Sequence, residues 1–144
     1  MITLFYAGLC TLLVLFLAGR VMARRVARKI GIGDGGDHEM LKRVRAHANA
    51  VEYLPLALLL LGGMELNGYP NGVIHAFGGT LLASRLLHAW GLSRSSGASP
   101  GRFTGILLTL LLMACMAVLA IVGYFTPILG GVPQVDESAQ HYGE

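Results

Sequence analysis

The chain has 144 residues, which is enough for one domain. Hydrophobic residues make up 54% of it and charged residues only 13%, and the mean hydropathy is +0.62. A soluble globular protein usually carries about 25% charged residues, so this chain has too few to cover a water-exposed surface. The composition therefore excludes an ordinary soluble domain and predicts a protein that lives in a bilayer.

Four apolar stretches follow one another along the chain. They cover residues 2–19, about 48–66, about 72–87 and 103–128. A membrane span needs about 20 residues, so the second and third stretches suffice only if their helices continue past charged ends, where arginine side chains can reach the interface. We therefore expect an all-α fold, an integral membrane four-helix bundle that forms a single domain. Its expected helices cover about 2–28, 38–66, 72–92 and 102–126, and a polar tail covers 129–144.

The first stretch begins at Ile2 with no basic residue before it. It lacks the positive leader of a cleaved signal peptide, so we expect it to be retained as a span. Both cysteines, Cys10 and Cys115, fall inside apolar stretches, which indicates buried thiols rather than a disulfide. Because no set of His, Cys, Asp and Glu residues has zinc spacing, no metal site is expected.

The connectors between the stretches differ sharply in charge. All eleven basic residues lie around the first and third connectors: Arg20, Arg24, Arg25, Arg28, Lys29, Lys42, Arg43, Arg45, Arg85, Arg94 and Arg102. The second connector and the tail carry none. The positive-inside rule then places the basic connectors in the cytoplasm and both termini outside. The simplest role for these cations is to set topology and contact anionic lipids, and the alternative is a pocket for a small anion.

The most informative segment is RVRAHANAVEYLP at 43–55, which leads from a charged region into the second stretch. Its polar residues at positions i, i+4, i+7 and i+8 are Arg45, Asn49, Glu52 and Tyr53. On a helix these fall within an arc of about 100°. A carboxylate at this depth costs about 2.5–3.5 kcal/mol, so Glu52 is expected to face protein or a wet cavity. Polar residues can also serve only as contacts between helices, but four on one face favour a ligand site.

These residues carry a resemblance to a known family. The pattern RxHxNxxEYxP resembles the signature of the MAPEG family, membrane-associated proteins in eicosanoid and glutathione metabolism. The upstream Ala23-Arg24-Arg25 is similar to the leukotriene-forming synthases, and Gly-Asp-Gly-Gly at 33–36 looks most like the bacterial branch. Arg85-Leu-Leu-His88 is similar to the RxxH of the prostaglandin-E synthase branch. The resemblance covers about residues 1–126.

The resemblance implies a four-helix bundle that assembles as a homotrimer. Glutathione, as co-substrate, would bind at the cytoplasmic side between neighbouring subunits. By motif match the binding residues would be Arg24, Arg45, His47, Asn49, Glu52, Tyr53 and His88. Glu52 would meet the α-amino group, and Arg24 of the next subunit would reach a carboxylate. The other expected partners are membrane lipids and an apolar electrophile, with no nucleic acid, and the expected location is a bacterial inner membrane.

The resemblance also implies an arginine that activates the thiol. A free thiol has a pKa of about 8.5, and a guanidinium within about 4–6 Å favours the reactive thiolate. Arg102 is the catalytic candidate, and Arg94 is its rival because the third connector is longer than in the eicosanoid synthases. Two tyrosines that some members place on the third helix correspond here to His88 and Leu92.

The function that follows is a glutathione transferase or peroxidase that acts on apolar electrophiles. One alternative is a non-catalytic membrane scaffold or lipid-binding bundle that keeps the pocket without the chemistry. A small transporter is a weaker alternative, because no pair of broken helices in two matching halves marks a midplane site.

Overall fold

The computed structural model describes residues 1–94 and 99–130, with side chains throughout except at 94 and 126–130. Within these ranges the chain forms helices and no strand, which confirms the all-α class. The helices are α1 (Ile2–Arg28), α2 (His38–Leu66), α3 (Asn71–Arg94) and α4 (Pro100–Gly130). The middle of the third connector and residues 131–144 of the predicted tail lie outside the described residues.

Length and composition suit the helices to a membrane. α1, α2 and the Pro100–Phe125 part of α4 are long and apolar enough to cross one, with mean hydropathies of 2.2, 1.2 and 2.8. α3 is not among the helices that meet this criterion within the described residues. It carries Ser84, Arg85 and His88, and these side chains are buried inside the bundle. The predicted integral membrane bundle is therefore confirmed, and the placement of both termini outside stays a prediction.

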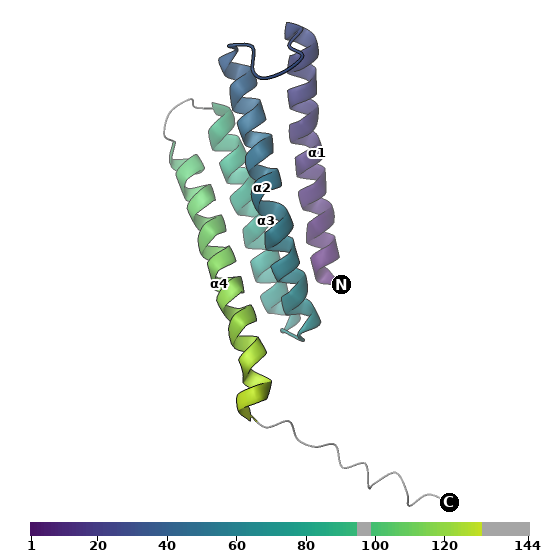
Figure 1. Cartoon of the computed structure of the whole chain (residues 1–144), viewed down its shortest axis with the longest axis vertical. Helices are drawn as coiled ribbons and strands as arrows, with labels where there is room; N and C mark the ends of the chain where they lie inside the picture. The colour runs from purple at the N-terminus through teal and green to yellow at the C-terminus, as the bar shows by residue number, and fades with distance from the viewer. Residues whose placement is uncertain (95–98, 131–144) are drawn as a thin grey trace, which may run out of the picture.

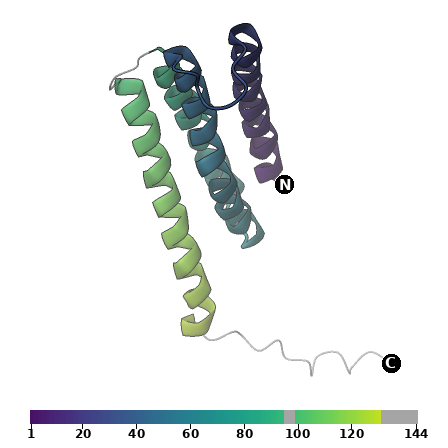
Figure 2. The same cartoon turned by 45° about the horizontal axis from the view of Figure 1, so that its top comes forward.

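Consecutive helices run in opposite directions (Figure 1). The connector from α1 to α2 lies at the same end of the bundle as the start of α4, and the N-terminus lies at the other end. α2 and α3 occupy the centre, whereas α1 and α4 flank them on opposite sides (Figure 2). α1 and α4 make no close backbone contact with each other within the described ranges. All the basic connector residues therefore gather at one end, called the basic end below.

The core is organised by one stripe along α2. Its buried residues are Ala46, Ala50, Leu54, Ala57, Leu61 and Met64, which recur every three or four positions. This spacing keeps one face of the helix turned toward its neighbours. The three alanines are small, so the neighbouring helices can approach the backbone of α2 closely.

α1 is held at the end opposite the basic one by a side chain of α2. The Glu65 carboxylate accepts hydrogen bonds from the backbone N–H groups of Ile2 and Thr3, the latter at 2.8 Å. The first N–H groups of a helix have no partner within the helix and carry its positive dipole end. Glu65 therefore satisfies two of these groups with a negative charge and fixes the start of α1 against the end of α2.

A second contact fixes α1 to α3. The Tyr6 hydroxyl donates to the His75 carbonyl at 3.2 Å, and its ring lies directly over Gly78. A Cβ atom at Gly78 would overlap that ring, whereas one at Gly79 would lie 3.7 Å from the Tyr6 hydroxyl. The close approach of α1 and α3 therefore depends on the missing side chain at Gly78.

The two cysteines have different surroundings. Cys10 is buried in the core, as predicted, and Cys115 is exposed on α4. The prediction of a buried thiol is wrong for Cys115 because α4 packs against its neighbours along one side only. An apolar sequence stretch does not show which side of its helix faces outward.

Substituting Gly78 and Gly79 separately tests the contact between α1 and α3. We expect Gly78→Ala to lower the free energy of unfolding by about 1–3 kcal/mol, the usual effect of overpacking. Gly79→Ala is the matched control and should change stability little, since its Cβ makes an ordinary contact. Thermal unfolding in detergent micelles measures both. Equal melting temperatures for the two variants would contradict this packing.

Candidate functional site

A cavity of about 170 Å³ lies between α2, α3 and α4 toward the basic end. The residues that line it are Arg45, Asn49 and Tyr53 from α2, His88 and Leu92 from α3, and Arg102 and Ile106 from α4. Five of these, all but Leu92 and Ile106, were predicted from the sequence as binding or catalytic residues. The lining contains two guanidinium groups and no carboxylate, so it suits an anion.

The helical rotation of α2 decides which motif residues reach the cavity. At about 100° per residue, Tyr53 lies closest to the buried stripe and Glu52 lies farthest from it. Tyr53 and Asn49 are accordingly half-buried, whereas Arg45 and Glu52 are exposed in the single chain. Three of the four residues therefore line one cavity, and Glu52 lies outside it.

Two glycines bring α3 and α4 together beside the cavity. A Cβ atom at Gly105 would lie 2.6 Å from the backbone nitrogen of His88, and one at Gly91 would lie 2.5 Å from that of Arg102. The helix backbones are thus in direct contact at both points. This contact is what places a residue of α3 and a residue of α4 in the same small cavity.

The close contact between α3 and α4 also determines which ring nitrogen of His88 carries the proton. Its Nδ1 lies 3.0 Å from the carbonyl oxygen of Arg102. A carbonyl can only accept, so Nδ1 carries the proton and donates it. In the neutral ring the other nitrogen, Nε2, is then the acceptor. His88 therefore contacts the first turn of α4 through Nδ1, and Nε2 is left without this partner on a residue that lines the cavity.

Arg85 of α3 lies beside the cavity and was not among the predicted binding or catalytic residues, although its RxxH pattern with His88 was part of the resemblance. Its side chain is only 2% exposed. Nη1 donates to Asn49 Oδ1 at 2.8 Å, and Nη2 donates to the Gly105 carbonyl at 3.3 Å. The guanidinium carbon lies 5.5 Å from the centre of the Tyr53 ring, within range of a cation–π contact. The available signal was a lone charge inside an apolar stretch, one turn before His88.

The other predicted site residues do not line this cavity. His47 is a half-buried residue of α2, and Arg24 lies on α1, which contributes nothing to the cavity. Arg94 ends α3, and its side chain lies outside the described residues. The contacts with glutathione that the resemblance assigned to Arg24, His47 and Glu52 stay predictions, and Arg102 is the thiol-activating candidate that the cavity contains.

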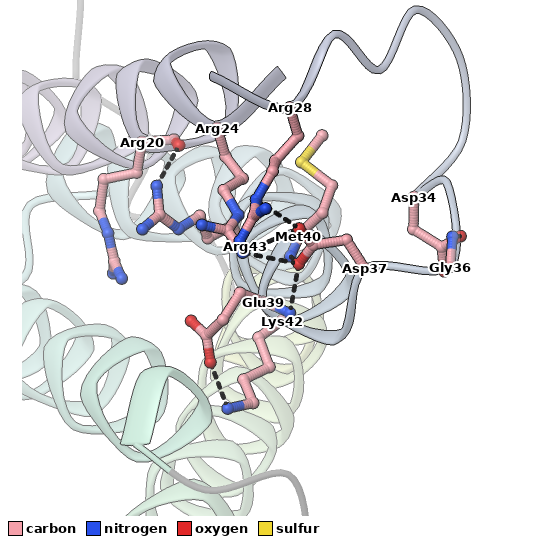
Figure 3. A network of polar contacts seen from close by, with 10 residues as sticks. All are labelled: Arg20, Arg24, Arg28, Asp34, Gly36, Asp37, Glu39, Met40, Lys42 and Arg43. Carbon is pink, nitrogen blue, oxygen red and sulfur yellow. Dashed lines mark hydrogen bonds and ion pairs between the residues drawn. The ribbon is translucent and has the colours of Figure 1, made fainter. Parts of the chain in front are cut away.

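Arg24 takes part in a polar network that joins α1 to the start of α2 (Figure 3). Asp37 caps α2 by accepting from the backbone N–H groups of Glu39 and Met40 at 2.9 and 3.0 Å. The same carboxylate pairs with Arg24 Nη2 at 2.8 Å and with Arg28 Nε at 3.4 Å. The hydrogen bond from Arg24 lowers the pKa of the Asp37 carboxyl below its usual value.

Comparison with known proteins gives the family. The family model described as MAPEG family matches residues 3–122, most of the chain. The chain belongs to the MAPEG family. Among its relatives are the proteins named inner membrane protein YecN of Escherichia coli strain K12 and of Escherichia coli O6:H1 strain CFT073. Each is 40% identical over 91 residues, which is 63% of this chain and 70% of the relative. The MAPEG membership that the motif on α2 indicated is therefore confirmed.

The ion pair of Asp37 predicts a pH dependence of stability. Because the folded state lowers the pKa of this carboxyl, the pair stabilises the fold above the unfolded value near 3.8 and loses its effect as pH falls through the folded value. Asp37→Asn keeps an oxygen for the helix cap but removes the charge. We expect this variant to melt below the wild type at neutral pH and the difference to shrink as pH falls below about 4.

Melting temperatures of the two proteins in detergent, measured across the acid range, check this expectation. A difference that stays constant down to the lowest pH would show that the charge of Asp37 does not stabilise the junction of α1 and α2.

Proposed function

We propose that this chain is a glutathione-binding protein of the bacterial inner membrane that acts as a transferase or peroxidase on apolar electrophiles. The observation that carries the proposal is the cationic cavity between α2, α3 and α4, with the guanidinium groups of Arg45 and Arg102 in its wall. Glutathione is a small peptide with two carboxylates and a thiol, and guanidinium groups pair well with carboxylates and thiolates.

The incompleteness of the cavity supports a site that a neighbouring subunit completes, and the assembly we propose is a homotrimer. The cavity volume of about 170 Å³ is below the roughly 300–1,000 Å³ of typical small-molecule pockets. Arg45, in its wall, and Glu52, beside it, are exposed in the single chain. Both lie on a helix long and apolar enough to cross a membrane, where a charge that faces lipid is unfavourable. A neighbouring subunit would enlarge the site and cover both residues. It would also bring its own Arg24 toward a carboxylate of the tripeptide and let Glu52 meet the α-amino group.

The chemistry would begin with the thiol. The Arg102 guanidinium would stabilise the thiolate, and Nε2 of His88, another residue of the cavity wall, would accept the proton that leaves the sulfur. Leu92 and Ile106 supply an apolar wall. An electrophile that arrives from the bilayer could therefore meet the sulfur without passing through water. The thiolate would form a bond to the electrophilic atom as the bond from that atom to its leaving group breaks. An aryl halide would lose halide, whereas a hydroperoxide would lose the alcohol, which takes up a proton, and leave the sulfur oxidised as a sulfenic acid.

The charge distribution and the relatives support the location. The basic connectors share one end of the bundle, which the positive-inside rule assigns to the cytoplasm. The cavity lies toward that end, so the site would open to the side where glutathione is found. The relatives named above are inner membrane proteins, which supports the same membrane for this chain.

Calorimetric titration of the detergent-purified protein with glutathione tests the binding. We expect heat of binding in the wild type and an affinity about tenfold or more weaker in Arg45→Ala, since hydrogen bonds to charged groups contribute about 1.5–3 kcal/mol. Lys42→Ala is the matched control, because Lys42 lies on the same helix but pairs with Glu39 at 2.6 Å, outside the cavity. No heat at millimolar glutathione would overturn the proposal.

The same preparations separate catalysis from binding alone. We expect glutathione to develop an ultraviolet thiolate band in the wild type and to lose it in Arg102→Ala. Turnover with an apolar aryl halide or a lipid hydroperoxide should fall in parallel. Binding with neither a band nor turnover would instead identify a non-catalytic bundle that keeps the pocket.

A further inference from the structure

Arg85 lies behind the cavity wall and not in it. Its guanidinium group is buried between α2, α3 and α4, and none of the ion pairs within the described residues involves it. Its Nε is also buried without a hydrogen-bond partner there. A buried cation that lacks a counter-charge is unfavourable, so its retention suggests that a negative charge arrives from elsewhere.

The contact with Asn49 has a definite chemical direction. A guanidinium group only donates, so the side chain of Asn49 must offer its carbonyl oxygen to Arg85, at 2.8 Å. The NH₂ group of the amide is thereby left for the cavity that Asn49 lines. The ring of Tyr53, 5.5 Å from the same guanidinium, holds the next cavity residue of α2 against Arg85. One buried side chain thus orients two residues of the wall.

We propose that Arg85 is a positioning residue that turns the donor side of the Asn49 amide into the cavity, and that the charge of Arg85 is balanced by the bound anion. The inference rests on the proposed function, because it takes glutathione as that anion. It adds a specificity rule to the site. The carboxylate or thiolate of the ligand meets hydrogen-bond donors from Arg45, Asn49 and Arg102, whereas a group that itself donates finds no acceptor at Asn49.

Two substitutions separate positioning from packing. Arg85→Met keeps a long side chain but frees the amide of Asn49 to turn, so we expect glutathione affinity to fall about tenfold or more. Asn49→Asp pairs with Arg85 and neutralises it, which should raise the melting temperature. Its second oxygen would face the cavity in place of the NH₂ group, so affinity should be lost although the fold becomes more stable. A purely structural role predicts that stability and affinity change together.

Thr109→Val is the matched control. Thr109 bonds Ser84 at 2.9 Å and the Gly105 carbonyl at 2.9 Å, so it is another buried polar contact between α3 and α4. It does not line the cavity. We expect this variant to melt at a lower temperature than the wild type and to bind glutathione with unchanged affinity.

Calorimetry with glutathione and thermal unfolding, run on the same four proteins, give the outcome. Wild-type affinity in Arg85→Met or in Asn49→Asp would overturn the positioning role. If the wild type itself binds no glutathione, the proposed function fails. The thermal unfolding data then test by themselves whether Arg85 is a buried cation without a counter-charge beside Asn49. A melting temperature of Asn49→Asp at or below that of the wild type would then overturn the inference about Arg85 as well.

Discussion

The hydrogen bond between the buried guanidinium of Arg85 and the carbonyl of Asn49 is the contact on which the candidate site depends. It connects the two central helices, and the second bond of Arg85, to the Gly105 carbonyl, adds α4. Charged hydrogen bonds are stronger where water is excluded, and an unmade one there is costly. Because the glycine contacts bring the backbones of α3 and α4 together, the Arg85 side chain on α3 can reach the Gly105 carbonyl on α4. A cationic cavity between three membrane helices is the direct result.

Much of the fold was predictable because it follows from composition and spacing. Too few charges for a water-exposed surface predicted the membrane, and the apolar stretches predicted the helices. The i, i+4 and i+8 spacing of Arg45, Asn49 and Tyr53 was enough to place them on one face, since the helical repeat is fixed. The structure brings the same three residues to one cavity. His88 and Arg102 came from the resemblance, and the packing of α3 on α4 shows how they meet.

The surroundings of the other residues depended on which helix or subunit covers each face of a helix. The sequence does not contain that information directly. Glu52 belongs to the same sequence motif as Asn49, but it lies on the far edge of the arc and outside the cavity. Cys115 lies in the most apolar helix and is exposed, because one side of α4 has no partner in the chain. Arg85 is one of eleven basic residues in the sequence, and its burial follows from the packing of α2 and α4 around it. Arg24 was expected at the ligand, and within its own chain it pairs with Asp37.

The most direct measurement is an experimental structure of the protein in a lipid environment with glutathione bound. The account predicts the peptide in the cavity between α2, α3 and α4, with its sulfur closest to Arg102 and an acceptor of the ligand facing the Asn49 amide. It also predicts a neighbouring subunit over Glu52. Glutathione bound elsewhere, or Glu52 facing lipid beside a cavity that contains only an acyl chain, would contradict it.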